Sequence, residues 1–219
     1  ASTGNNDGSS WANAFTKLQD ALDLARTCST VKNIWIAKGT YYPDEGAGYT
    51  NNSIDSSFKM VNGVTIYGGF TGAEFTISQR NISANPTLLS GEIQQDNAQN
   101  NNSITVVRGL NLADTLKLDG IAITKGFAQF NPIAESVSGI NCKGTNISFK
   151  NVAISENQCS SNTSTNSVAI AGIYFKSGIL EIIDINHFFM RANDAVKFYK
   201  TGDREHQEKY AKYIHQAYH

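Results

Sequence analysis

The chain has 219 residues, and its 18 Lys and Arg against 19 Asp and Glu give a formal net charge of -1. It contains no basic stripe, and no apolar run approaches the roughly 20 residues that span a bilayer. We therefore expect no nucleic-acid partner, no insertion into a membrane and one elongated domain.

Uncharged polar residues dominate several stretches, at 5–10, 100–103 and 160–167. Asn, Ser, Thr and Gly in this abundance are common in extracellular β-proteins. The chain opens at Ala1 without a charged-then-apolar leader, as a processed export product or a trimmed chain would. We expect an extracellular or cell-surface location.

An amphipathic helix is expected near the N-terminus, with Ser9 or Ser10 as its N-cap. Its apolar residues recur at spacings of three and four and share one face: Trp11, Phe15, Leu18, Leu22 and Ala25. Such a helix needs an apolar surface to cover.

Short alternating strands follow, at 34–43, 58–70, 87–93 and 104–110, separated by Gly and Asn turns. Between residues 31 and 186 no further helical pattern is long enough for the crossover of a conventional α/β fold. The strands must therefore pair by another route.

An internal repeat supplies that route. The segments 116–124, 147–155 and 180–188 align, and apolar residues fall in register: Leu116 with Ile147 and Leu180, Leu118 with Phe149 and Ile182, Ile121 with Val152 and Ile185. A repeat of this size without a helix cannot bury its apolar face alone, so we expect successive copies to stack as parallel coils of a solenoid.

The order of these segments resembles the right-handed parallel β-helix proteins of bacterial surfaces, of the pectate-lyase-like superfamily and Bacteroidetes type. The resemblance covers about residues 4–186. It implies an all-β fold, a right-handed single-stranded parallel β-helix, in which residues 1–30 carry a capping helix and 31–186 form the coils. It is poor for function, because this architecture hosts lyases, glycosidases, adhesins and passive shafts.

The last segment, 187–219, departs from the repeat and is richer in charge. We expect a helical cap or docking tail whose Tyr-rich stripe lies on the open end of its own solenoid or on a second copy. His215 and His219 stand four residues apart, the spacing of two metal ligands on one helical face. Solvated histidines near a terminus are the alternative.

A glycan-binding surface is the first functional hypothesis. If Ile34 and Ile36 point inward, alternation turns Trp35 outward. Further aromatic residues that offer flat rings to sugars lie on nearby segments: Tyr41, Tyr42, Tyr49 and Tyr67. The alternative is that Trp35 packs beneath the N-terminal cap or a long loop such as 44–57.

Carbohydrate cleavage is the second hypothesis, by a polysaccharide lyase or a glycosidase-like enzyme. Stacked coils would bring Asp119 near Asp184 or Glu156, although Asn151 interrupts that column. Turn residues of this kind usually satisfy backbone donors, so we favour a noncatalytic protein without a cofactor, a glycan-binding adhesin or a structural spacer.

The three cysteines, Cys28, Cys142 and Cys159, cannot form a dense disulfide framework. Either all are inert thiols, or Cys142 and Cys159 form a bridge between neighbouring coils.

Overall fold

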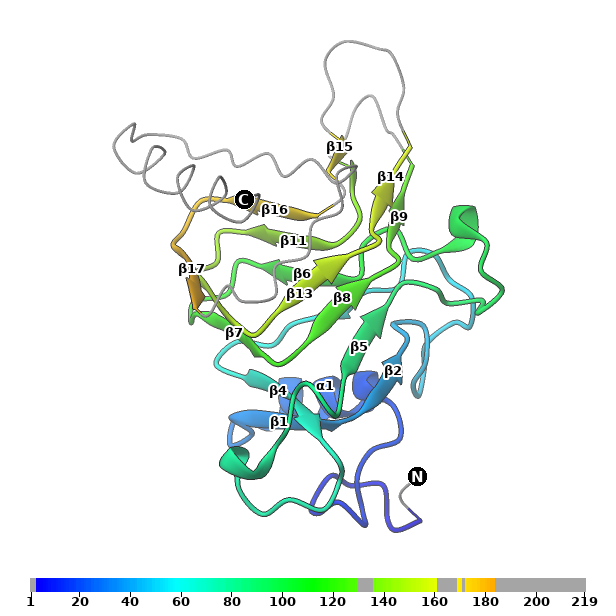
Figure 1. Cartoon of the computed structure of the whole chain (residues 1–219). Helices are drawn as coiled ribbons and strands as arrows, with labels where there is room; N and C mark the ends of the chain where they lie inside the picture. The colour runs from blue at the N-terminus through cyan, green and yellow to red at the C-terminus, as the bar shows by residue number, and fades with distance from the viewer. Residues whose placement is uncertain (1–2, 130–135, 161–168, 171, 184–219) are drawn as a thin grey trace.

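A computed structural model describes residues 3–129, 136–160, 169–170 and 172–183. The strands form three parallel sheets that the chain visits in the same order on each coil (Figure 1). Sheet A consists of β1 (Asn33–Ala37), β4 (Thr65–Phe70), β7 (Leu116–Asp119), β12 (Ile147–Lys150) and β17 (Leu180–Ile183). The chain is therefore a parallel β-solenoid, as the repeat predicted.

Sheets B and C complete each coil. Sheet B consists of β2 (Gly39–Tyr41), β5 (Thr87–Ser90), β8 (Ala122–Thr124) and β13 (Ala153–Ser155). Sheet C consists of β3 (Phe58–Lys59), β6 (Val107–Leu110), β11 (Ile140–Lys143) and β16 (Ile173–Lys176). Short pairs extend the later coils: β9 (Phe127–Ala128) with β14 (Gln158–Cys159), and β10 (Ser136–Val137) with β15 (Ala169–Ile170).

The register of the repeat is confirmed strand by strand. Ile147 pairs with Leu116 on one side and with Leu180 on the other, and Phe149 pairs with Leu118 and Ile182 in the same way. Stacking places like side chains above one another at the strand spacing of about 4.8 Å. The repeat thus predicts the strand partners and the register of these two columns, whereas Ile185 of the third aligned set lies outside the described residues.

Inward columns of these strands form one hydrophobic core. Ile66, Leu118 and Phe149 are successive members of one column, and each is 1% exposed. Fully burying a side chain of this size contributes roughly 1.5–3 kcal/mol. The core therefore runs along the axis of the solenoid and joins the coils to each other.

The N-terminal helix is shorter than the pattern predicted. α1 spans Leu18–Thr27, and its buried Leu18, Leu22 and Ala25 join the solenoid core. Its N-cap is Lys17, without a side-chain cap, so the prediction of Ser9 or Ser10 is wrong.

Tertiary contacts hold the preceding segment out of the helix. Gly4 N–H donates to Ala12 O at 3.0 Å, and the Trp11 ring nitrogen donates to Glu74 O at 2.8 Å. The Trp11 ring packs against Phe70 with 5.5 Å between centroids. Trp11 is thus fixed by the second coil instead of by a helical turn.

The loop 71–86, between β4 and β5, includes η1 (Ile77–Gln79) and is fastened to sheet A by Arg80. Arg80 Nη2 lies 2.5 Å from Asp119 Oδ2, and their side chains are 10% and 13% exposed. Arg80 Nη1 donates to Gly68 O and Asp119 O, and the guanidinium lies 5.3 Å from the Tyr67 ring centroid. This loop therefore covers part of the outer face of sheet A.

The three cysteines are free thiols, so the alternative of a bridge between Cys142 and Cys159 is not realised. Cys142 is buried beside Gly109, and desolvation raises its pKa to about 12. Cys159 Sγ lies 3.8 Å from Ser138 Oγ. The helices of the described ranges are too short or too polar to span a bilayer.

Candidate functional site

The aromatic residues suggested by the sequence lie in three different surroundings. Trp35 and Tyr67 are register partners on β1 and β4, on the outer side of sheet A. Trp35 stacks on Phe70 with 4.9 Å between ring centroids and 8° between planes, and Trp11 lies 6.3 Å away. Tyr67 lies under the Arg80 guanidinium. Both rings have protein neighbours, and glycan binding by them stays a prediction.

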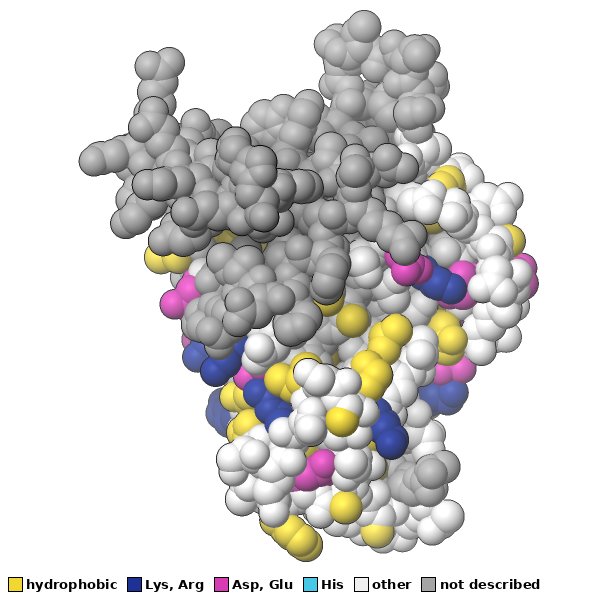
Figure 2. Space-filling model, in the orientation of Figure 1, with side chains coloured by type: hydrophobic (Ala, Val, Ile, Leu, Met, Phe, Trp, Pro, Cys, Tyr) yellow, Lys and Arg dark blue, Asp and Glu magenta, His cyan; other side chains and the backbone are white. Residues whose placement is uncertain are grey.

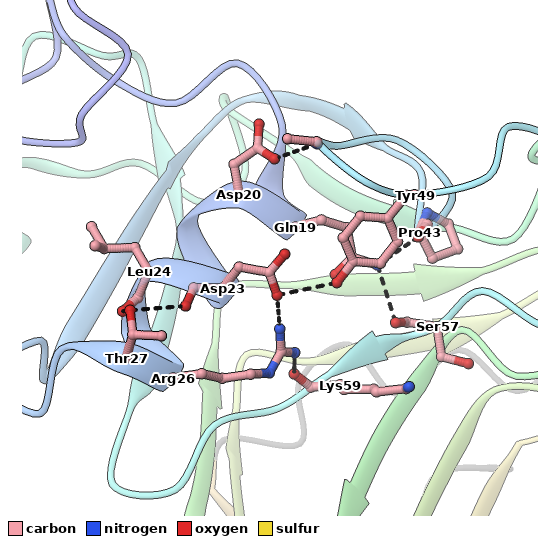
Figure 3. A network of polar contacts seen from close by, with 11 residues as sticks. Gln19, Asp20, Asp23, Leu24, Arg26, Thr27, Pro43, Tyr49, Ser57 and Lys59 are labelled. Atoms are coloured by element: carbon pink, nitrogen blue, oxygen red, sulfur yellow. Dashed lines mark hydrogen bonds and ion pairs between the residues drawn. The ribbon is translucent and has the colours of Figure 1, made fainter.

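Tyr49 belongs to the long loop that packs on α1 (Figure 3). Its hydroxyl donates to Asp23 Oδ1 at 3.2 Å, and Asp23 also pairs with Arg26. Arg26 Nη2 donates to Lys59 O at 2.6 Å. Burial is the largest cause that raises the pKa of the Tyr49 hydroxyl, followed by the charge of Asp23. Tyr49 thus connects the loop to the helix.

Tyr41 ends β2 and Tyr42 follows it directly, but their surroundings differ. The Tyr41 hydroxyl donates to Ala37 O at 3.0 Å, and the ring packs against the core, where burial raises its pKa. Burial first, and then the charge of Glu45, raise the pKa of Tyr42. Lys125 lowers it by a smaller amount. Tyr41 pairs in register with Leu89 of β5, so Tyr42 lies one coil before the turn that leads to Glu92.

A lateral pocket of about 280 Å³ opens next to Lys125. Its lining residues are Glu92, Asn97, Gln99, Asn102, Lys125, Gly126, Phe127, Glu156 and Gln158. We call this site the lateral pocket. Figures 1 and 2 have the same orientation. At the position of β9 and the loop after β5 in Figure 1, Figure 2 shows basic and acidic side chains next to each other. The volume is near the lower end of the range for small-molecule sites, about 300–1,000 Å³.

Three stacked turns build the lateral pocket. Ser90, Thr124 and Ser155 are register partners in sheet B, so the residues that follow them occupy equivalent positions. Lys125 and Glu156 both adopt left-handed backbone conformations there, with φ of 59° and 58°. Their side chains therefore leave the solenoid one coil apart at the same turn.

Buried asparagines hold the backbone of this turn. Asn157 is 1% exposed; its Oδ1 accepts from Gly126 N–H at 2.9 Å, and its Nδ2 donates to Ile123 O at 3.0 Å. Asn102 Nδ2 donates to Lys125 O at 2.8 Å. A Cβ on Gly126 would lie 2.2 Å from Ser138 O, so only glycine fits. The pocket floor is thereby pre-organised.

An ion pair forms one side of the lateral pocket. Lys125 Nζ lies 3.3 Å from Glu92 Oε2, and Glu92 Oε1 accepts from Asn97 N–H at 3.0 Å. The Glu92 side chain is 8% exposed and that of Lys125 is 35% exposed. Both carboxylate oxygens of Glu92 are therefore engaged.

Several polar groups in the lateral pocket retain hydrogen-bonding capacity. Among the described residues, no hydrogen bond or ion pair engages the exposed side chains of Gln99, Glu156 and Gln158. Asn102 is 3% exposed, and its Oδ1 is buried without a hydrogen-bond partner. Side-chain amides both donate to and accept from hydroxyl groups, and an ionised carboxylate accepts from them.

The lateral pocket corrects one sequence prediction. Glu156 was expected near Asp119, but Asp119 pairs with Lys150 in register, and its carboxylate bonds to Arg80 and Asn151. Glu156 instead follows β13 of sheet B and lies one coil from Lys125, which follows β8. The repeat alignment already contained that signal, because Lys125 and Glu156 each follow a repeated strand directly.

The remaining predicted ligands fall elsewhere. Asp184, His215, His219 and the tail 187–219 lie outside the described residues. Within the described ranges, no cluster of three or more His, Cys, Asp and Glu side chains is placed to hold a metal ion. Comparisons of the chain with known protein families, with curated proteins and with solved structures find no match.

Proposed function

We propose that this chain is a noncatalytic saccharide-binding β-solenoid of a secreted or cell-surface protein, with the lateral pocket as its binding site. The supporting observation is the set of unpartnered amide and carboxylate groups beside the ring of Phe127, in a pocket the size of a small ligand. Sugars present many hydroxyls and apolar ring faces, which match these two kinds of surface.

Rigidity supports the same proposal. The turn that carries Lys125 is fixed by Asn102 and Asn157, so binding would order few groups and lose little conformational entropy. Tyr42 follows β2, which pairs with β5 one coil before the turn that leads to Glu92, and it is the member of the predicted aromatic set that we assign to this site. A ligand longer than one sugar residue extends from the lateral pocket toward it.

The wider setting belongs to the proposal as well. A right-handed coil is the handedness that parallel connections overwhelmingly adopt. With it, the chain would fit the pectate-lyase-like architecture of bacterial surface proteins, where a solenoid acts as an adhesin or a spacer. The amide-rich composition accords with an extracellular location, and self-association through the tail 187–219 remains part of this proposal.

One observation favours an enzyme as the second candidate. Glu92, Glu156 and Lys125 line the same pocket. A glycosidase needs two carboxyl groups about 5–9.5 Å apart, and a lyase needs a base beside bound substrate. Release of reducing ends or of unsaturated products from polysaccharides, abolished by Glu156→Gln, would establish this candidate and contradict a noncatalytic role.

The binding proposal is tested on a glycan array with three proteins. The double variant Gln99→Ala/Gln158→Ala removes two pocket amides that make no structural hydrogen bond, and we expect affinity to fall about tenfold or more. Asn51→Ala, an exposed amide in the loop 44–57, is the matched control and should keep wild-type affinity. Equal binding by all three proteins would refute the assignment of the lateral pocket.

A further inference from the structure

The lateral pocket carries more negative than positive charge. Its lining contains two carboxylates, Glu92 and Glu156, and one ammonium group, Lys125, so the formal sum is -1. The other lining side chains are amides, a glycine and a phenyl ring, which carry no charge. The placement of these three charges decides which ligands the site accepts.

The positive charge is already neutralised from within. Lys125 pairs with Glu92, whose side chain is only 8% exposed and whose second oxygen accepts from Asn97 N–H. A ligand anion that recruited Lys125 would leave Glu92 nearly buried without its counter-ion. Taking the cation from a carboxylate that is only 8% exposed is unfavourable, by an amount that the 35% exposure of Lys125 reduces.

The remaining carboxylate of the lateral pocket belongs to Glu156. Glu156 is exposed, and among the described residues no hydrogen bond or ion pair engages it. Its left-handed backbone, at the turn stacked on that of Lys125, fixes the direction in which the side chain leaves the solenoid. A carboxylate at this position accepts hydrogen bonds from hydroxyl or ammonium groups and repels other carboxylates.

From this arrangement we infer that the lateral pocket discriminates against acidic sugars and takes saccharides without carboxylate or sulfate groups. The inference rests on the proposed saccharide-binding function and specifies the ligand class of the same site. Exclusion has two causes: repulsion by Glu156, and the engagement of Lys125 by Glu92. The uncharged amides then supply the hydrogen bonds that hold the neutral ring.

The test uses oligosaccharide pairs that differ only at C6, a hydroxymethyl group in one member and a carboxylate in the other. Glucan with glucuronan, galactan with galacturonan and mannan with mannuronan trisaccharides are titrated into the full chain by calorimetry. In any pair that binds, we expect the acidic member to bind at least about tenfold more weakly. That ratio should shrink as salt is raised, since the repelling Glu156 carboxylate is exposed.

Charge variants separate the local effect from the net charge of the protein. Glu156→Gln should reduce the discrimination ratio several-fold. Glu181→Gln, an exposed carboxylate on β17, changes the net charge equally and should leave the ratio as in wild type.

The outcomes are distinguishable. Neutral members that bind in the lateral pocket with acidic members equal or tighter would overturn this inference and leave the proposed function in place. Absence of binding to every pair would overturn the proposed function and this inference with it. An equal effect of Glu181→Gln and Glu156→Gln would show that the discrimination arises from net charge, against the assignment to Glu156.

Discussion

Replacing Arg80 by Met should destabilise the solenoid strongly, because it removes one partner of a nearly buried ion pair. Arg80→Met keeps most of the aliphatic stem and deletes the guanidinium that meets Asp119 at 2.5 Å. Asp119 would then retain the hydrogen bond from Asn151 Nδ2 at 3.0 Å as its side-chain partner. Tyr67 would also lose the cation above its ring.

The size of the effect follows from burial. Breaking a buried pair from one side costs about 3–5 kcal/mol, and the 10% and 13% exposure of these side chains places the pair near the lower end. A loss of about 3 kcal/mol corresponds to a fall of roughly 6–12 °C in Tm for a domain of 150–250 residues. Urea unfolding followed by circular dichroism measures the free energy of unfolding directly.

Two further variants define the control and the refutation. Lys17→Met breaks an exposed pair with Glu45, whose side chains are 40% and 26% exposed, and should change stability by less than about 1 kcal/mol. The double variant Arg80→Met/Asp119→Leu removes both charges and should regain most of the loss. If Arg80→Met were as mild as Lys17→Met, or the double variant no better than the single one, the reasoning from burial would be wrong.

Three other predictions concern packing, thiols and acid. Gly68→Ala should lower the free energy of unfolding by about 1–3 kcal/mol, because the added Cβ would lie 2.3 Å from Gly120 O. Urea unfolding would show this as a lower midpoint, and an unchanged midpoint would contradict the close coil packing. At pH 8 an alkylating reagent should label Cys28, whose pKa is lowered by the Thr30 hydroxyl, long before Cys142; mass spectrometry of native and unfolded protein checks this. Desolvation raises the pKa of Glu74, but N–H donors of its own loop outweigh it and lower the pKa to about 2. Its contribution, measured as the Tm difference from Glu74→Gln, should be full above about pH 4.5 and vanish toward pH 2, and a difference that persists at pH 2 would argue against it.

The parallel architecture could be predicted because the core repeats along the chain. Leu116, Ile147 and Leu180 recur at matching positions, and stacking in register packs all three in one column, with Leu116 and Ile147 buried and Leu180 partly buried. The helix boundary could not be predicted in this way. Trp11 has a helical spacing from Leu18, yet its hydrogen bond to Glu74, 63 residues away, decides its conformation.

The lateral pocket escaped prediction because its parts have different sequence origins. Lys125 and Glu156 are repeat positions, so their alignment was available from the sequence. Glu92 and Asn102 come from a loop that the other coils do not share, and no periodicity indicates where such a loop returns. The contact between Glu92 and Lys125 depends on that return.

The repeat itself separates positions that serve stability from positions free to serve recognition. Leu89, Ile123 and Ile154 pair across β5, β8 and β13 and all point into the core, so coil stacking demands apolar residues there. Two residues later the same turn carries Gly, then Lys125, then Glu156, three side chains of unlike size and charge. Stacking tolerates this variation because the side chains of Asn102 and Asn157 form hydrogen bonds with the backbone of the turn. These bonds do not depend on the side chains of Lys125 and Glu156. Apolar stacking therefore does not dictate which charges the lateral pocket carries, and the proposed binding site lies at the positions that the core leaves free to vary.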